Sequence, residues 1–245
     1  MLYSYLSGGG SIKQIILELL LSLPIVLIAL TFHEYAHGWV SYKCGDPTAR
    51  NLGRLTLNPI KHLDLIGTLS MVLFGFGWAK PVPVNSRYYK KPRAQMALVA
   101  AAGPIMNLII AFVSLIIYHS LLAIPKIENS FYMVSASYAG VIYYLPTFAD
   151  NLAFIAVQFF VNMATMNVYL AVFNLIPLPP LDGSRILFIF LPTKYYFKIM
   201  RYERYIAIIL IILIAVGALS GILGTLASLV INGMEWLIRL IPIFR

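Results

Sequence analysis

The 245-residue chain contains few charged residues and almost no cysteine. Charged residues make up 11% of the sequence and hydrophobic residues 60%, whereas a soluble domain has about 25% and about 45–50%. This composition excludes a water-soluble globular protein and predicts a polytopic membrane protein. Cys44 is the single cysteine, so no intrachain disulfide can form. Residues 1–14 lack the features of a cleaved signal peptide, so we expect the first span to act as an uncleaved signal.

The charges that are present are mostly positive, with 18 Lys and Arg against 9 Asp and Glu. On a soluble protein this excess would suggest nucleic acid as the partner. Here the positive residues lie beside apolar runs, mainly in residues 43–93 and 185–204. Cytoplasmic loops of membrane proteins are enriched in Lys and Arg, so both segments are predicted to face the cytoplasm. The partner predicted from charge is therefore the lipid bilayer and not nucleic acid.

Long apolar runs predict an all-α polytopic membrane protein with about four to five transmembrane helices, since each crossing needs about 20 apolar residues. The clearest runs cover residues 12–42, 94–118, 151–176 and 205–231. We expect one membrane-embedded domain over residues 1–245, with its core in residues 12–191 and a C-terminal span in residues 205–231.

The segment between the first two spans does not resemble a simple helix. Residues 50–58 have strand-like character, and residues 63–77 form an apolar but short stretch that is interrupted by glycines. Alternate prolines in residues 78–85 favour extended backbone, because proline lacks an N–H group and restricts the residue before it. These features predict a small β or re-entrant element here. Residues 124–150 carry one lysine and are expected to form a loop on the outer side.

Ionisable residues interrupt the first apolar run at His33, Glu34 and His37. Two histidines four residues apart lie on the same face of a helix and can bind one metal ion, and the adjacent glutamate is placed to act on a metal-bound water. Ionisable groups within a span are costly and are usually functional. The pattern predicts a metal-dependent hydrolase that works within the bilayer. The alternative is a pair of histidines that only form hydrogen bonds inside a helix bundle.

A catalytic zinc usually has three protein ligands, so a third is expected elsewhere in the chain. The candidates are His62, Asp64, His119, Asp150 and Asp182. His119 and Asp150 fall at the predicted outer side, at the wrong depth. Asp182 is the best choice, since it follows a proline-rich break at the cytoplasmic end of a span, and irregular backbone at this depth is tolerated where it lines a cavity. Its alternative role is to cap the short helix that follows.

Several motifs together resemble the site-2 protease family of intramembrane zinc metalloproteases. The two most specific are His33-Glu34-Tyr35-Ala36-His37 and the downstream pattern Asn-x-x-Pro-x-x-x-Leu-Asp-Gly, which this chain matches from Asn174 to Gly183. Further stretches resemble its small prokaryotic members, namely Asn58-Pro59-x-x-His62-x-Asp64-x-x-Gly67, Gly77-Trp78-Ala79-Lys80-Pro81-Val82-Pro83-Val84-Asn85 and Gly103-Pro104-x-x-Asn107. The similarity spans residues 30–190. The chain departs from the best-known bacterial members in having no stretch for a PDZ domain.

The resemblance implies Zn²⁺ as the cofactor, with His33, His37 and Asp182 as its ligands and Glu34 as the general base. It also implies that the substrates are membrane proteins, which we expect to be single-span proteins cut by regulated intramembrane proteolysis. The expected location is a prokaryotic cell membrane, with the active site toward the cytoplasmic side. Alternative functions are a catalytically silent membrane scaffold, a metal-binding or metal-transporting membrane protein, and a different membrane metallohydrolase.

Two asparagines on spans near the site, Asn107 and Asn174, are candidates for binding the substrate backbone or the oxyanion. Hydrogen bonding between helices is an equally good interpretation of both. His62 and Asp64 can orient metal ligands, although a plain interfacial role is favoured for them. We further expect a segment with extended backbone, residues 50–58 or 78–85, to hold an unwound substrate at its edge.

Overall fold

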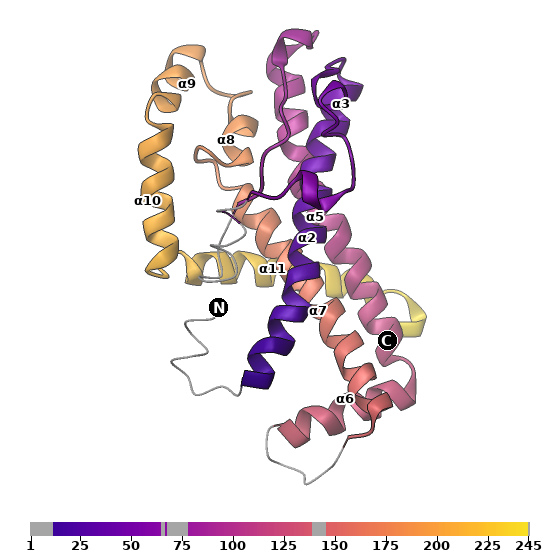
Figure 1. Cartoon of the computed structure of the whole chain (residues 1–245). Helices are drawn as coiled ribbons and strands as arrows, with labels where there is room; N and C mark the ends of the chain where they lie inside the picture. Colours follow the sequence, from indigo (N-terminus) through magenta and orange to yellow (C-terminus); the bar gives the residue numbers. More distant parts are fainter. Residues whose placement is uncertain (1–11, 65–66, 68–77, 139–145, 245) are drawn as a thin grey trace.

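A computed structural model of the chain describes residues 12–64, 67, 78–138 and 146–244 (Figure 1). The described part is helical, as predicted. Its α-helices are α2 (Ile12–Lys43), α3 (Thr48–Asn51), α5 (Pro92–Leu122), α6 (Pro125–Tyr138), α7 (Phe148–Asn174), α8 (Asp182–Leu187), α9 (Thr193–Met200), α10 (Glu203–Ala215) and α11 (Ser220–Ile238). Three short 3₁₀ helices are η1 (Pro59–Lys61), η2 (Ser86–Tyr88) and η3 (Pro242–Phe244).

Four described helices are long and apolar enough to cross a membrane: α2 from Leu20, α5, α7 and α11. This agrees with the predicted number of spans and with a multi-pass membrane protein. The predicted spans over residues 12–42, 94–118 and 151–176 correspond to α2, α5 and α7.

Helix α5 packs against both α2 and α7, and these three helices form the bundle that carries the site (Figure 1). Small residues with almost no exposed surface lie along the bundle: Ala29, Ala97, Ala100, Gly103, Ala111, Ala164 and Ala171. Within a membrane, small side chains favour helix association because they let two backbones approach closely. The close approach of α5 to α2 decides the geometry of the site described below.

Helix α11 runs crosswise to α2, α5 and α7 (Figure 1). Ala227 of α11 packs with Ala111 of α5 and Val168 of α7, and Ile238 packs with Leu115 of α5. His119 Nε2 lies 2.7 Å from a carboxylate oxygen of Glu235, so a polar contact joins the end of α5 to α11.

The predicted single span over residues 205–231 is wrong, because α10 and α11 are separate helices. Gly217 has φ +72°, a left-handed conformation that glycine adopts without steric cost. The N–H of Ala218 donates to Leu213 O at 2.9 Å, and the N–H of Gly217 donates to Ile214 O at 3.0 Å. These two bonds form a Schellman motif, which ends a helix by satisfying its last carbonyl groups.

The predicted outer loop over residues 124–150 is also wrong in part, since α6 occupies its first half. Phe131 of α6 stacks on Phe154 of α7 with ring centroids 5.6 Å apart. Ser130 donates to Asp150 at 2.6 Å, and the same carboxylate belongs to the capping box that begins α7. A short helix with a polar face has no long apolar run, and its stability comes from the packing against α7.

The predicted small β element is not present among the described residues. In place of a strand, residues 50–58 contain the end of α3 and a turn at Gly53, which has φ +63°. A single antiparallel bridge joins Leu63 to Ala79. Most of the predicted re-entrant stretch, residues 63–77, lies outside the described residues, while residues 81–85 run without helix or strand pairing, as the alternate prolines predict.

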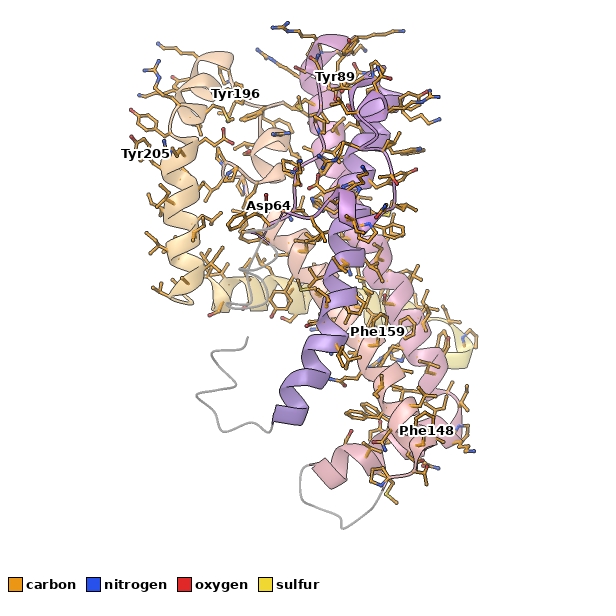
Figure 2. The ribbon with its side chains drawn as sticks, viewed as in Figure 1. Asp64, Tyr89, Phe148, Phe159, Tyr196 and Tyr205 are labelled. Atoms are coloured by element: carbon orange, nitrogen blue, oxygen red, sulfur yellow. The ribbon has the colours of Figure 1, made fainter. Side chains whose placement is uncertain are left out.

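A fully buried carboxylate, Asp46, joins the end of α2 to the segment before α5. One oxygen accepts from the Ser41 hydroxyl at 2.8 Å and from the N–H of Asn85 at 2.7 Å. The other accepts from the N–H of Thr48 at 2.9 Å and from its hydroxyl. The Tyr89 hydroxyl completes the cluster, 2.6 Å from Ser41, and lies at the same end of the molecule as Tyr196 (Figure 2). Burial acts to raise the pKa of Asp46, but these hydrogen bonds outweigh it and hold the pKa below its ordinary value.

Replacing Asp46 with Asn is expected to lower the free energy of unfolding by about 1–3 kcal/mol, since an amide nitrogen replaces one of two oxygens that accept hydrogen bonds. The contribution of an acid whose pKa is lowered on folding is complete above its unfolded pKa, about 3.9, and is lost as the pH falls. The melting temperature of the wild type in detergent should therefore fall more steeply below pH 4 than that of Asp46→Asn. Equal acid dependence of the two proteins, with exposed Glu128→Gln as control, would contradict this role for Asp46.

Candidate metal centre

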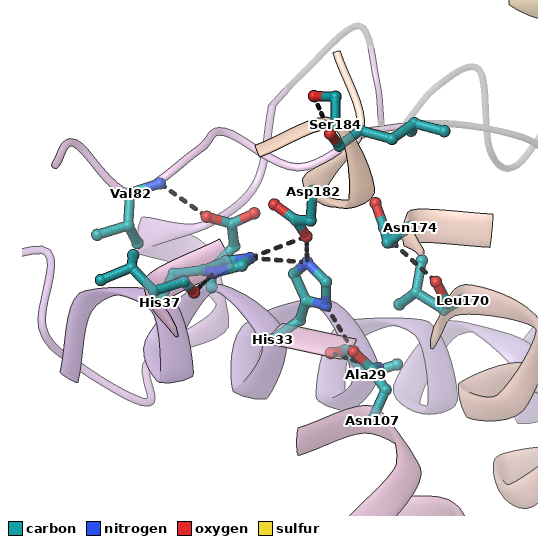
Figure 3. Close-up of polar contacts among 12 residues, drawn as sticks. Ala29, His33, His37, Val82, Asn107, Leu170, Asn174, Asp182 and Ser184 are labelled. Atoms are coloured by element: carbon teal, nitrogen blue, oxygen red, sulfur yellow. Dashed lines mark hydrogen bonds and ion pairs between the residues drawn. The ribbon is translucent and has the colours of Figure 1, made fainter. Parts of the chain in front are cut away.

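Two side chains of α2 and one from a distant part of the chain converge at one point in the bundle (Figure 3). His33 Nε2 and His37 Nε2 are 3.0 Å apart. Each lies 3.2 Å from the same oxygen of Asp182. The two histidines are buried, with 5% and 9% of their surface exposed. These are the three residues that the sequence motifs predicted to act together.

Local structure explains why each of them points at the others. His33 and His37 are one turn apart on α2, so their rings share one face of the helix. Asp182 is the first residue of α8, which follows the proline-rich break after α7. A Cβ on Gly183 would lie 2.3 Å from Leu175 O, so only glycine lets α8 begin this close to the end of α7. The helix cap is Leu181, and the alternative role of Asp182 as the cap is therefore wrong.

The outer ring nitrogens of both histidines are held by acceptors. His33 Nδ1 lies 2.5 Å from Asn107 Oδ1, and His37 Nδ1 lies 2.7 Å from the carbonyl oxygen of Val99. Because carbonyl oxygens only accept, both Nδ1 atoms carry the hydrogen. In neutral imidazoles this leaves both Nε2 atoms with lone pairs that point at one another and at the carboxylate of Asp182.

The two Nε2 atoms and the Asp182 oxygen all present lone pairs, with no hydrogen between them. Such a set of lone pairs can bind a zinc ion. Zinc binds histidine nitrogen and carboxylate oxygen at about 2.0–2.2 Å in tetrahedral geometry, which places neighbouring ligand atoms about 3.3 Å apart. The observed separations of 3.0, 3.2 and 3.2 Å match such a face. Hydrogen bonds from the outer nitrogens are also typical of histidines that bind metals.

Asp182 supplies the third ligand atom, and a carboxylate brings a negative charge that favours a divalent cation over a neutral ligand.

Helix α5 approaches the two imidazoles so closely that only glycine fits at position 103. A Cβ added to Gly103 would lie 2.4 Å from His37 Nε2 and 2.7 Å from His33 Nε2, well inside van der Waals contact. The absence of a side chain therefore lets the two imidazoles lie against the α5 backbone.

Glu34 is adjacent to the first histidine and is held by the extended segment before α5. One of its carboxylate oxygens accepts from the N–H of Val82 at 2.7 Å, drawn as a dashed line in Figure 3. Arg54 holds the same segment from another direction, since its guanidinium donates to Lys80 O at 2.7 Å and to Pro81 O at 3.2 Å. Val82 lies between two prolines, so within residues 81–83 its N–H is the only backbone donor.

The remaining predicted residues have other surroundings. Asn107 is fully buried, and both ends of its amide contact α2 or α7, which favours the interhelical role over contact with substrate. Asn174 donates to Leu170 O on its own helix at 2.9 Å, and its role in substrate binding stays a prediction. His62 Nε2 bonds Thr56 O at 2.7 Å, within the segment before α5. An oxygen of Asp64 accepts from the N–H of Gly67 at 2.9 Å.

Sequence reasoning missed three contributors to the site. Val99 and Val82 contribute only backbone groups, so nothing in their side chains signals the role. Asn167 is fully buried on α7, and its Oδ1 accepts from Asn107 Nδ2 at 2.8 Å. A polar residue in an apolar run is a usable signal, and Asn167 could have been found in this way.

A zinc-type donor set with an adjacent glutamate, with both histidines and the glutamate on a helix of membrane-spanning length, indicates a metal-dependent hydrolase of the membrane. The chain belongs to Peptidase family M50, the site-2 protease family, whose model matches residues 22–217. It is an intramembrane zinc metalloprotease by this membership, its cofactor is Zn²⁺, and its substrates are membrane proteins.

Two curated relatives are similar to the chain. "Putative zinc metalloprotease YwhC" of Bacillus subtilis is 42% identical over 180 residues, which cover 74% of this chain and 73% of the relative. "Putative zinc metalloprotease Rip2" of Mycolicibacterium smegmatis is 26% identical over 162 residues, which cover 64% of this chain and 52% of the relative. No solved structure matches the chain significantly.

Replacing Gly103 with Ala is expected to remove zinc binding and to lower cleavage on the order of 100-fold, because the new methyl group displaces both imidazoles. Zinc content by atomic absorption and cleavage of a membrane substrate measure the two effects. Gly221→Ala on α11 is the matched control, since a Cβ there meets nothing within 4 Å. Normal zinc content in Gly103→Ala would contradict the close approach of α5.

Proposed function

We propose that the chain cuts single-span membrane proteins within or near their transmembrane segments, with Glu34 as the general base. The observation that carries this proposal is the placement of His33, Glu34 and His37 on α2, a helix long and apolar enough to cross the bilayer, with Asp182 of α8 completing the zinc-type donor set. His33, His37 and Asp182 are the proposed ligands. When bound, zinc would supply a Lewis acid that activates water and polarises the peptide carbonyl.

Glu34 has the position that a general base needs, next to the first histidine of the site. The N–H of Val82 bonds Oε2 and thereby orients the carboxylate. The other oxygen, Oε1, is proposed to accept a proton from the attacking water and to deliver it to the leaving amine. Holding Glu34 through a backbone group leaves its position independent of flexible side chains.

The substrate must unwind before it is cut, since a helix hides its carbonyl groups in its own hydrogen bonds. We propose that residues 80–85 bind the unwound strand along their edge. Three charged groups hold this segment in place, namely Arg54 on two carbonyls, Glu34 on Val82 and Asp46 on Asn85. A fixed extended backbone is a better template for pairing than a mobile one, because less conformational entropy is lost on binding.

The site is proposed to face the cytoplasmic side of a prokaryotic cell membrane. Tyr89 belongs to the basic segment 43–93 and Tyr196 to the basic segment 185–204. Both are at one end of the molecule, and Phe148 is at the other (Figure 2). The positive-inside rule assigns the basic end to the cytoplasm. We further propose that residues 1–245 form one membrane-embedded domain, with its core in residues 12–191 followed by the separate helices α10 and α11.

Replacing Glu34 with Gln is expected to abolish cleavage of a single-span substrate in detergent while zinc stays bound, because an amide cannot accept the proton. Wild type and variant are compared by gel and by mass spectrometry of the cut site, with and without a zinc chelator. Equal cleavage by both proteins would rule out Glu34 as the base. Zinc binding without cleavage by either protein would favour a catalytically silent scaffold.

Replacing Val84 with Pro tests the substrate edge without disturbing the N–H of Val82 that holds Glu34. We expect cleavage of a membrane-spanning substrate to fall about tenfold, since one backbone donor of the edge is lost. Cleavage of a short flexible peptide, which has no helix to unwind, should change much less. Equal loss on both substrates would indicate damage to the site, and full activity on both would exclude the edge.

A further inference from the structure

A chain of side-chain hydrogen bonds crosses the bundle from α7 through α5 to His33. Asn167 on α7 and Asn107 on α5 are both fully buried. Asn167 Nδ2 donates to Met163 O at 2.8 Å, Asn107 Nδ2 donates to Asn167 Oδ1 at 2.8 Å, and His33 Nδ1 donates to Asn107 Oδ1 at 2.5 Å. Every polar atom of the two amides therefore has a partner.

Met163 O, at the α7 end of this series of hydrogen bonds, fixes which way each amide in the series points. An asparagine amide can be turned over, which exchanges its donor and its acceptor. The carbonyl oxygen of Met163 belongs to the backbone and can only accept, so it requires the nitrogen of Asn167 on its side. The oxygen of Asn167 must then face Asn107, and it requires a nitrogen there in turn.

The same constraint reaches the imidazole. With its nitrogen facing Asn167, Asn107 presents its oxygen to His33, and this oxygen requires a hydrogen on Nδ1. The ring of a neutral histidine carries one hydrogen, so Nε2 keeps the lone pair that faces His37 and Asp182. A second acceptor, Ala29 O, lies 3.4 Å from Asn107 Nδ2, and at that distance it constrains the amide far less than Asn167 does.

We propose that Asn167 is a positioning residue that sets the tautomer of His33 and so prepares it to bind zinc. This inference rests on the proposed ligand role of His33. Two hydrogen bonds separate Asn167 from His33 Nδ1, and the hydrogen on Nδ1 leaves the lone pair for zinc on Nε2. His37 needs no such relay, because its Nδ1 donates directly to the backbone carbonyl of Val99.

A purely structural role of Asn167 leads to a different expectation. An interhelical hydrogen bond that only stabilises the bundle affects the melting temperature and leaves the tautomer of His33 unchanged. The proposed relay from Asn167 through Asn107 predicts that loss of Asn167 changes the tautomer of His33 and leaves that of His37 unchanged. Without Asn167, the amide of Asn107 can turn over, and its nitrogen would then face His33 Nδ1 and favour the hydrogen on Nε2.

The test is solid-state ¹⁵N NMR of histidine-labelled, metal-free protein in bilayers at a pH where the imidazoles are neutral, with His33→Gln used for assignment. In Asn167→Leu we expect His33 to shift from the Nδ1–H form toward the Nε2–H form, while His37 stays unchanged as an internal control. Zinc affinity, measured by chelator competition, should fall about tenfold, as is typical when a group that orients a metal ligand is lost.

Two further variants separate the relay from general damage. Asn167→Ser keeps the direction of the chain, since a hydroxyl donates to the carbonyl four residues back and accepts on its oxygen, so we expect it to restore much of the Nδ1–H form. Asn162→Leu removes an exposed asparagine of the same helix and should behave as the wild type. If Asn167→Leu does not fold, the Ser variant and an Asn107→Leu variant report on the two links separately.

An unchanged His33 tautomer and unchanged zinc affinity in Asn167→Leu would overturn the relay, as would an equal effect of Asn162→Leu. Failure of the proposed function has a different signature. If His33→Gln leaves zinc affinity unchanged, the ligand role is wrong, whereas the tautomer measurement on metal-free protein still decides the relay.

Discussion

The convergence of three acceptor atoms inside an apolar bundle is the constraint on which the rest of the structure depends. Two imidazole nitrogens and a carboxylate oxygen lie 3.0–3.2 Å from one another, and a cation bound between them would offset their mutual repulsion. Holding them there requires α2, α5 and α8 to meet at one point. Gly103 and Gly183 allow that meeting, because a side chain at either position would occupy the space of the site or of the backbone beside it.

The hydrogen bonds of the buried polar groups around the site also specify which atom of each side chain donates and which accepts. A backbone carbonyl can only accept and cannot be turned over. Val99 O therefore fixes the hydrogen of His37 on Nδ1, and Met163 O fixes the orientation of the Asn167 amide. Asp46 fixes the segment that orients Glu34 by accepting the N–H of Asn85. In a low-dielectric interior an unpaired polar group is costly, so each such network favours one arrangement of the helices.

The sequence predicted the all-α membrane fold and the three residues that converge, because both depend on local patterns. Apolar length predicts α2, α5 and α7, and the spacing of His33 and His37 predicts their shared face. Its errors have physical causes. Gly217 ends a helix inside a continuous apolar run, and α6 is stabilised by stacking on α7 in place of hydrophobic length. The strand-like residues 50–58 contain the end of α3 and a turn.

The sequence by itself determined the membrane class, the family and the three residues that converge at the site, since composition, helical periodicity and motif spacing are properties of the chain. Only the tertiary structure decided which groups hold those residues. The contacts of Glu34 with Val82, of His37 with Val99 O and of Asn107 with Asn167 depend on the rotation and depth of one helix against another. Small residues at the interfaces set that packing through close approach of the backbones, and no periodicity within a single helix specifies it.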